Sequence, residues 1–133
     1  MKISAKVQSS FARLATSVMT DDQPRSLVVP SKESGNGSAV NGGELLLLAL
    51  ATCFCNDIYR EAAKRNMEVH EVEVIASAEF GAAGEPGRNF QYSTHVKADA
   101  TDEEIKELIM HTDKVAEIHN TLRQGVEVNI KMS

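Results

Sequence analysis

An almost uninterrupted apolar run near the middle of the chain most constrains how it can fold. Residues 45–51 (LLLLALA) are all apolar, and only Thr52 interrupts the run before Cys55. A membrane-spanning helix needs about 20 such residues, so a run of this length indicates a helix in a protein core. The first half of this helix is apolar on every side, which predicts burial all round. We therefore expect one long buried helix at the centre of the fold.

Polar residues mark both ends of this helix. Asn41, followed three positions later by Glu44, resembles a capping box. The second half, residues 56–66 (NDIYREAAKRN), is amphipathic. Lys64 lies near its end, where the helix dipole favours a cation. We expect the helix to run for roughly 24 residues, to about residue 66.

Alternating polar and apolar residues precede the helix. Residues 2–9 and 12–20 alternate, which predicts two strands, the first of them half-buried. Residues 21–24 (DDQP) predict a turn, and residues 27–29 (LVV) a short third strand that Pro30 ends. These three strands would form an antiparallel meander.

The segment after the helix mixes strands and helices. The expected elements are strands over 72–80 and 90–98 joined by a hairpin loop, a helix opened by a capping box at 101–104, a helical segment at about 114–123, and a last strand over 126–132. Gly125 would stop the second helical segment. The complete order, βββ-α-ββ-α-α-β, predicts an α+β fold.

Length and charge limit the class of protein. A chain of 133 residues predicts a single domain over residues 1–133. A net charge of −5 with only 14 Lys and Arg argues against nucleic acid or a membrane surface as a partner.

The N-terminus lacks the apolar run of a signal peptide, so we expect a cytoplasmic protein. An all-round apolar helix needs more cover than one such chain supplies, so we also expect a homodimer that shares it.

Two cysteines, Cys53 and Cys55, lie on this helix. They are about 200° apart around its axis, so they cannot bridge to each other within a regular helix. Cys53 shares a face with Asp57 and Arg60. A reactive thiolate needs a nearby cation or hydrogen-bond donors, and Arg60 is two turns away. The alternative is that both cysteines are small buried apolar residues.

Two further residues are candidates for a pocket. Glu44 is first a capping residue and second a possible catalytic carboxylate. His119 could line a pocket or could simply pack or cap. The four histidines lack metal-ligand spacing among themselves and with the cysteines, so we expect no metal and no cofactor.

Two segments resemble motifs of the OsmC/Ohr family of thiol-based peroxide-defence proteins. Residues 42–54 (GGELLLLALATCF) are similar to the family pattern P-x-E-L-L-x-A-x-A-A-C-F, and residues 116–122 (AEIHNTL) are similar to its second motif, C-P-V-H-x-T-L. The expected order of elements also matches that family along nearly the whole chain. The resemblance implies an intertwined homodimer in which a helix cysteine attacks a peroxide. A second cysteine then resolves the sulfenic acid, and an arginine and a glutamate hold the reacting groups.

Only one of these four roles transfers directly. Cys53 matches the peroxidatic cysteine, and Ala116 stands where the resolving cysteine would be. The family glutamate that takes part in the reaction directly follows the proline of the motif, at the position written x. Gly43 occupies that position here, and Glu44 is one position late. The loop that carries the family arginine, residues 31–43, contains no arginine.

Two functions therefore stay open. The first is a thiol-dependent reductase of organic hydroperoxides that acts through Cys53 with an external thiol reductant. It predicts a lowered Cys53 pKa. The second is a non-catalytic OsmC-like dimer that binds a small apolar ligand at its interface, with Glu44, Cys55 and His119 as possible pocket residues.

Overall fold

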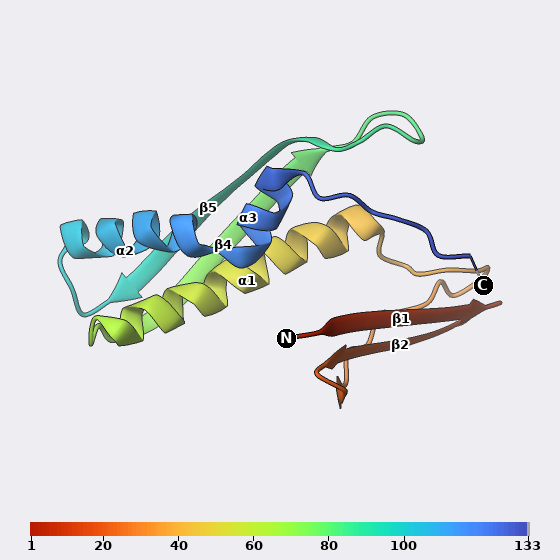
Figure 1. The fold of residues 1–133 in the computed structure, drawn as a ribbon, viewed down its shortest axis with the longest axis horizontal. Coiled ribbons are helices and arrows are strands. Elements are labelled where there is room, and N and C mark those ends of the chain that lie inside the picture. The colour runs from red at the N-terminus through yellow and green to blue at the C-terminus, as the bar shows by residue number, and fades with distance from the viewer. Residues whose placement is uncertain (133) are drawn as a thin grey trace. The chain divides into compact units, whose positions relative to one another are not determined.

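A computed structural model describes residues 1–132. The chain divides into two compact units, Met1–Leu45 and Leu46–Ser133. The elements follow in the order β1, β2, β3, α1, β4, β5, α2, α3 (Figure 1). Three helices and two antiparallel sheets confirm the predicted α+β class.

The first unit contains a three-stranded antiparallel meander of β1 (Ile3–Ser10), β2 (Arg13–Thr20) and β3 (Gln23–Arg25). Asp21 and Asp22 both adopt positive φ, as a two-residue hairpin turn requires. The third strand therefore begins directly at residue 23, and the strand predicted over residues 27–29 is absent. Residues of β1 are exposed throughout, so the prediction that this strand is half-buried is wrong.

Helix α1 (Gly42–Lys64) begins with the predicted capping box. The Glu44 backbone N–H donates to Asn41 Oδ1 at 2.8 Å, and the Asn41 N–H donates to Glu44 Oε1 at 3.0 Å. Asn66 adopts the left-handed conformation just beyond the last turn, which closes the helix two residues earlier than expected.

The second half of α1, not the first, supplies the core. Phe54 and Ile58 are fully buried, whereas Leu48 is 61% exposed. The expected all-round burial is therefore wrong for the first half of the helix within one chain. Length and composition alone would also let α1 cross a membrane, but core helices pass the same test. The packed residues Phe54 and Ile58 identify α1 as a core helix.

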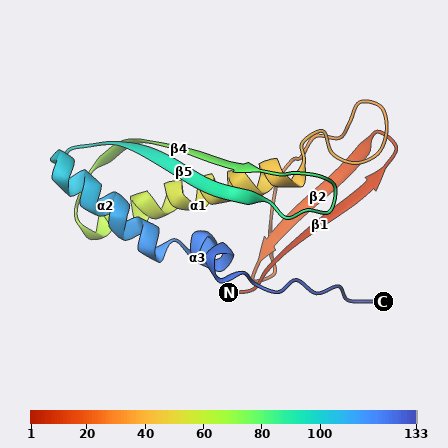
Figure 2. The same cartoon turned by 90° about the horizontal axis from the view of Figure 1, so that it is seen from above.

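A two-stranded antiparallel sheet of β4 (Val69–Glu79) and β5 (Arg88–Ala98) carries the helices of the second unit on one face (Figure 2). Its alternation agrees with the sequence: Val72 and Val74 are half-buried while the residues between and beside them are exposed. The core cluster contains Phe54, Ile58, Ala62, Val96, Leu108 and Ala116.

Helix α2 (Asp102–Val115) and helix α3 (Glu117–Gln124) complete the second unit. Thr101 caps α2, because its Oγ1 accepts from the Glu104 N–H at 3.2 Å. Ala116 separates the two helices with an extended backbone, and Gly125 ends α3 in the left-handed region.

The predicted last strand over residues 126–132 does not form. A strand requires a hydrogen-bonded neighbour, and in the part of the chain that the structure describes this segment pairs with no strand. Its apolar side chains are open to solvent, with Val128 90% and Ile130 86% exposed.

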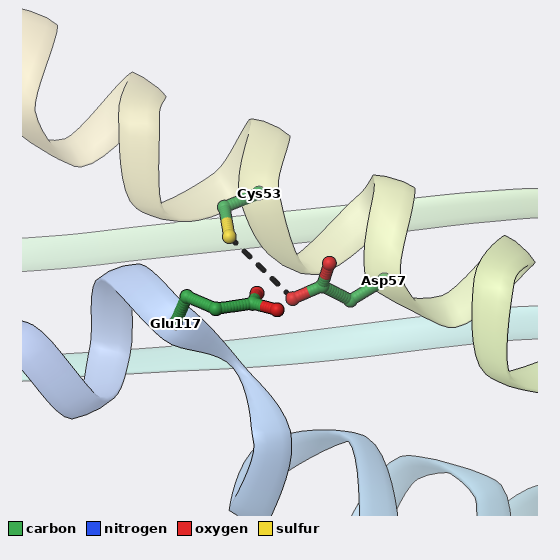
Figure 3. Close-up of side chains that lie close together, drawn as sticks. All are labelled: Cys53, Asp57 and Glu117. Carbon is green, nitrogen blue, oxygen red and sulfur yellow. Dashed lines mark hydrogen bonds between the residues drawn. The ribbon is translucent and has the colours of Figure 1, made fainter. Parts of the chain in front are cut away.

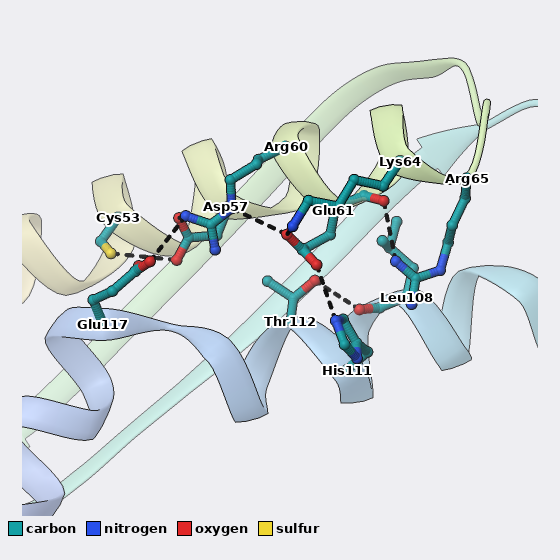
Figure 4. A network of polar contacts seen from close by, with 10 residues as sticks. All are labelled: Cys53, Asp57, Arg60, Glu61, Lys64, Arg65, Leu108, His111, Thr112 and Glu117. Carbon is teal, nitrogen blue, oxygen red and sulfur yellow. Dashed lines mark hydrogen bonds and ion pairs between the residues drawn. The ribbon is translucent and has the colours of Figure 1, made fainter.

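A buried carboxylate joins α1 to α2. The Glu61 side chain is 3% exposed and contacts Lys64, Arg60 and His111 at 2.8, 3.0 and 2.9 Å (Figure 4). These positive and hydrogen-bonding partners lower the pKa of Glu61 to about 2, with Lys64 the largest cause. Glu61 is therefore ionised over the physiological range and fixes α2 against α1.

Candidate functional site

Three side chains with oxygen or sulfur ligand atoms meet where α3 begins beside α1. Cys53 and Asp57 lie one turn apart on α1, and Glu117 is the first residue of α3 (Figure 3). Cys53 Sγ donates to Asp57 Oδ2 at 3.5 Å. One sulfur or oxygen atom from each of the three residues lies within 4.8 Å of the others. This cluster therefore places two carboxylates beside the thiol of the family motif.

Arg60 bridges the two carboxylates. Its Nη1 lies 3.0 Å from Asp57 Oδ1 and 3.0 Å from Glu117 Oε1 (Figure 4). Asp57 is nearly buried, with 7% of its side chain exposed, whereas 40% of the Arg60 side chain is exposed. The guanidinium of Arg60 therefore compensates the negative charge on Asp57 and Glu117. The Cys53 thiol donates its hydrogen bond to the carboxylate of Asp57.

The Cys53 thiol holds its proton in this arrangement. Burial raises the pKa of Cys53, and the Asp57 carboxylate raises it further. A hydrogen bond from the Ile118 backbone acts in the opposite direction. The lowered pKa of Cys53 expected for an enzyme is therefore not found, because the sulfur is partly buried and contacts a carboxylate instead of a cation.

The two carboxylates differ in their affinity for a proton. Burial raises the pKa of Asp57, and the charge of Glu117 contributes to the rise. The pKa of Glu117 is lowered by its own backbone N–H at the start of α3, and Arg60 adds to the effect. The carboxyl of Asp57, next to the Cys53 sulfur, consequently takes up a proton more readily than that of Glu117.

The same three residues form one of two groups of potential metal ligands among the described residues. Thiolate and carboxylate suit a divalent ion such as zinc. Arg60 already bridges Asp57 and Glu117, however, so a cation would have to displace its guanidinium. The second group of close ligands, Glu68, His70 and Asp99, is exposed.

The other expected site residues are placed apart from this cluster. Glu44 is committed to the α1 cap through Asn41. Cys55 is partly buried on α1 and has no disulfide partner among the described residues. Ala116, where the resemblance places a resolving cysteine, is fully buried at the start of α3.

His119 lines a separate cavity of about 590 Å³ within the second unit. The residues around the cavity are mainly apolar or aromatic: Leu50, Gly87, Phe90, Gln91, Tyr92, His119, Leu122 and Arg123. The His119 ring lies 4.6 Å from the Tyr92 ring and 5.5 Å from the Phe54 ring, measured between centroids. Burial lowers the pKa of His119, so the imidazole is neutral.

Sequence reasoning found part of this site. The i, i+4 spacing placed Asp57 on the same face as Cys53, and the helix brings the two together. The role of Glu117 was missed, because its contact with α1 depends on how α3 packs. The Tyr92–Asp113–Arg123 hydrogen-bonded cluster beside the cavity was also missed, since its members come from different elements.

The fold and the site define a class of α+β proteins. Their cysteine thiol lies on a long helix, here α1, beside the start of a short helix near the end of the element order, here α3. A family model described as OsmC-like protein matches residues 35–131, and the chain belongs to that family. No curated protein sequence matches the chain.

Solved structures of the family share the fold at low sequence identity. An organic hydroperoxide resistance protein OsmC from Legionella pneumophila is 22% identical, with a TM-score of 0.58 and coverage of 96% of this chain and 93% of that one. An OsmC-like protein from Mycoplasma pneumoniae is 20% identical, with a TM-score of 0.58 and coverage of 94% and 87%. An organic hydroperoxide resistance protein of Bacillus subtilis is 18% identical, with a TM-score of 0.55 and coverage of 96% and 94%.

Proposed function

We propose that this protein reduces organic hydroperoxides through Cys53 and uses an external thiol as reductant. The observation that carries the proposal is the position of Cys53, the cysteine of the family motif, with a proton acceptor, Asp57 Oδ2, 3.5 Å from its sulfur. Membership of the OsmC-like family and its hydroperoxide-resistance neighbours support the same class of reaction.

Asp57 acts in this reaction as a proton relay. As the sulfur attacks the peroxide, the thiol proton passes to Asp57, whose Oδ2 lies 3.5 Å from the sulfur. The O–O bond breaks, and Asp57 returns the proton to the leaving alkoxide. The products are an alcohol and a sulfenic acid on Cys53, so the peroxide is reduced and the sulfur is oxidised.

An external thiol completes the cycle, because Ala116 offers no resolving sulfur. The first thiol condenses with the sulfenic acid to a mixed disulfide and releases water. A second reductant thiol attacks the sulfur of the first in that mixed disulfide. Cys53 is released as a free thiol, and the two reductant thiols leave joined as a disulfide.

We also propose a cytoplasmic homodimer as the working form. The first half of α1 leaves apolar side chains uncovered in one chain, including Leu48 at 61% exposure. A second copy that packs there would bury this surface, and the cytoplasm would keep Cys53 reduced.

The test is consumption of an organic hydroperoxide by the reduced protein with dithiothreitol present. Cys55→Ser is the matched control, because it removes a thiol from the same helix. Turnover that survives in Cys55→Ser and is lost in Cys53→Ser supports the proposal. Turnover that is equal in the two variants contradicts it.

A second candidate function is that of a non-catalytic dimer that binds a small apolar ligand at its interface. The raised pKa of Cys53 and the cavity beside His119 favour it. A slowly alkylated Cys53 in a protein that does not consume peroxide would select this candidate.

A further inference from the structure

A buried imidazole without a hydrogen-bond partner lies at the cavity of the second unit. His119 is 5% exposed, and within residues 1–132 neither of its ring nitrogens has a partner. A neutral imidazole has one N–H donor and one acceptor nitrogen. Leaving such a group buried and unpaired is unfavourable, so each ring nitrogen that gains a hydrogen-bond partner stabilises the site.

The cavity around this imidazole suits an aromatic group. Phe90 and Tyr92 contribute rings from β5, and Leu50 and Leu122 contribute aliphatic side chains from α1 and α3. A volume of about 590 Å³ is in the range of small-molecule pockets. Apolar walls with one polar group are typical of a site that orients a mainly apolar ligand.

The cavity has little free charge to offer a ligand. Arg123 lies at its edge, but its Nη2 is 2.6 Å from Asp113 Oδ1 and its Nη1 donates to Asn120 Oδ1 at 3.1 Å. The Tyr92 hydroxyl also donates to Asp113. Among the described residues that line the cavity, the cation Arg123 is paired with Asp113, so a neutral ligand fits better than a carboxylate or phosphate.

We propose that this cavity binds a neutral aromatic ligand that carries one hydroxyl group, which hydrogen-bonds to His119. The hydroxyl pairs with one of the two ring nitrogens, either donating to the unprotonated nitrogen or accepting from the N–H, and the ring packs among Leu50, Phe90 and Leu122. The inference does not depend on peroxide reduction, because Cys53 does not line the cavity.

The start of α3 relates this ligand site to the thiol. Glu117 contacts the Cys53 cluster, whereas His119, two residues later on α3, lines the cavity. The backbone of Ile118 lies between them and acts to lower the pKa of Cys53. A ligand that fixes His119 would therefore also fix the backbone that contacts the sulfur.

The experiment compares benzyl alcohol with ethylbenzene, which has the same number of heavy atoms but no hydroxyl. Affinities of both are measured by NMR titration of the wild type, His119→Phe and the control His95→Phe, which replaces an exposed imidazole on β5. The ratio of the two affinities within each protein is the readout, because differences in ligand hydration cancel between proteins.

In His119→Phe the ratio should shift by about tenfold toward ethylbenzene, the value of one hydrogen bond of this kind. His95→Phe should keep the wild-type ratio. His119→Phe should also melt at a higher temperature, because it removes two unpaired buried nitrogens. An unchanged ratio in His119→Phe, or no binding of either probe to the wild type, would overturn the proposal.

A second variant covers the case in which His119→Phe does not fold. Leu122 is 38% exposed and tolerates a larger side chain, so Leu122→Trp should narrow the cavity. Both affinities should then fall together while the ratio is kept. Affinities that are unaffected by Leu122→Trp would mean that the probes do not bind in the cavity. Affinities that weaken as the protein concentration rises would mean that a second copy of the chain occupies it. Either result overturns the proposal.

Discussion

Cys53 donates a hydrogen bond from its thiol to the carboxylate of Asp57, one turn further along α1. A carboxylate in this position stabilises the protonated thiol, so the resting protein has an unreactive sulfur with a proton acceptor in contact. In thiol enzymes the ease of forming a thiolate and the ability to complete the reaction often occur together. Here Asp57 affects them in opposite directions, because it disfavours the thiolate but can accept the thiol proton.

Replacing Asp57 by Asn should change these two properties in opposite directions. Loss of the charge lowers the pKa of Cys53, so alkylation by iodoacetamide at neutral pH should become faster. Loss of the proton relay should reduce hydroperoxide turnover by about 10²–10⁴-fold, the range for a general acid–base group. Both rates are measured on the same preparation.

Asp102→Asn is the control for this prediction, because it removes an exposed carboxylate from the start of α2. Alkylation and turnover that rise together in Asp57→Asn would show that Asp57 only suppresses the thiol. The relay would then be wrong.

Restoring a cysteine at residue 116 should give the protein a resolving thiol. Ala116 directly precedes Glu117, and Glu117 contacts the Cys53 cluster. One equivalent of organic hydroperoxide should convert Ala116→Cys to a form with an intrachain disulfide, seen as the loss of two hydrogens by intact mass spectrometry. A product that keeps a free thiol at residue 116 would place it too far from Cys53.

The salt-bridged Glu61 should make stability depend on acid pH. Its pKa is about 4.5 when unperturbed and about 2 in the folded protein, so its stabilising effect is complete above pH 4.5 and is lost as the pH falls toward 2. Urea unfolding of Glu61→Gln should show a lower stability at neutral pH and a shallower decline over that interval. Glu33→Gln, in the exposed loop before α1, is the control. An unchanged slope in Glu61→Gln would mean that the ion pairs do not persist in solution.

Phe54 should be the most sensitive core position. Its side chain is fully buried, and its ring lies 4.7 Å from the Tyr92 ring. Phe54→Ala should lower the free energy of unfolding by about 3–5 kcal/mol in urea titrations. Phe11→Ala, at a side chain that is 66% exposed, should change it by less than about 0.5 kcal/mol. Equal effects would contradict the assignment of the core to the second unit.

Features that depend on neighbouring residues in the chain could be predicted from the sequence. The Asn41–Glu44 and Thr101–Glu104 caps and the alternation of β4 follow from local spacing, and the structure confirms them. The i, i+4 relation between Cys53 and Asp57 is local in the same sense.

Features that depend on a partner elsewhere could not be predicted. Apolar alternation over residues 126–132 indicates a strand, but a strand forms only where another strand pairs with it. The apolar first half of α1 indicates burial, yet one chain leaves Leu48 exposed. The direction of the Cys53 pKa depends on packing, because the approach of Glu117 and the burial of the thiol follow from how α3 sits against α1.

Trapping the oxidised form of Cys53 shows directly whether this sulfur reduces an organic hydroperoxide. The reduced protein is treated with one equivalent of cumene hydroperoxide without a thiol reductant and then with dimedone, and the modified residue is located by mass spectrometry. We expect a dimedone adduct on Cys53, none on Cys55, and an equal amount of alcohol released from the peroxide. Unmodified Cys53 with the hydroperoxide intact would contradict it.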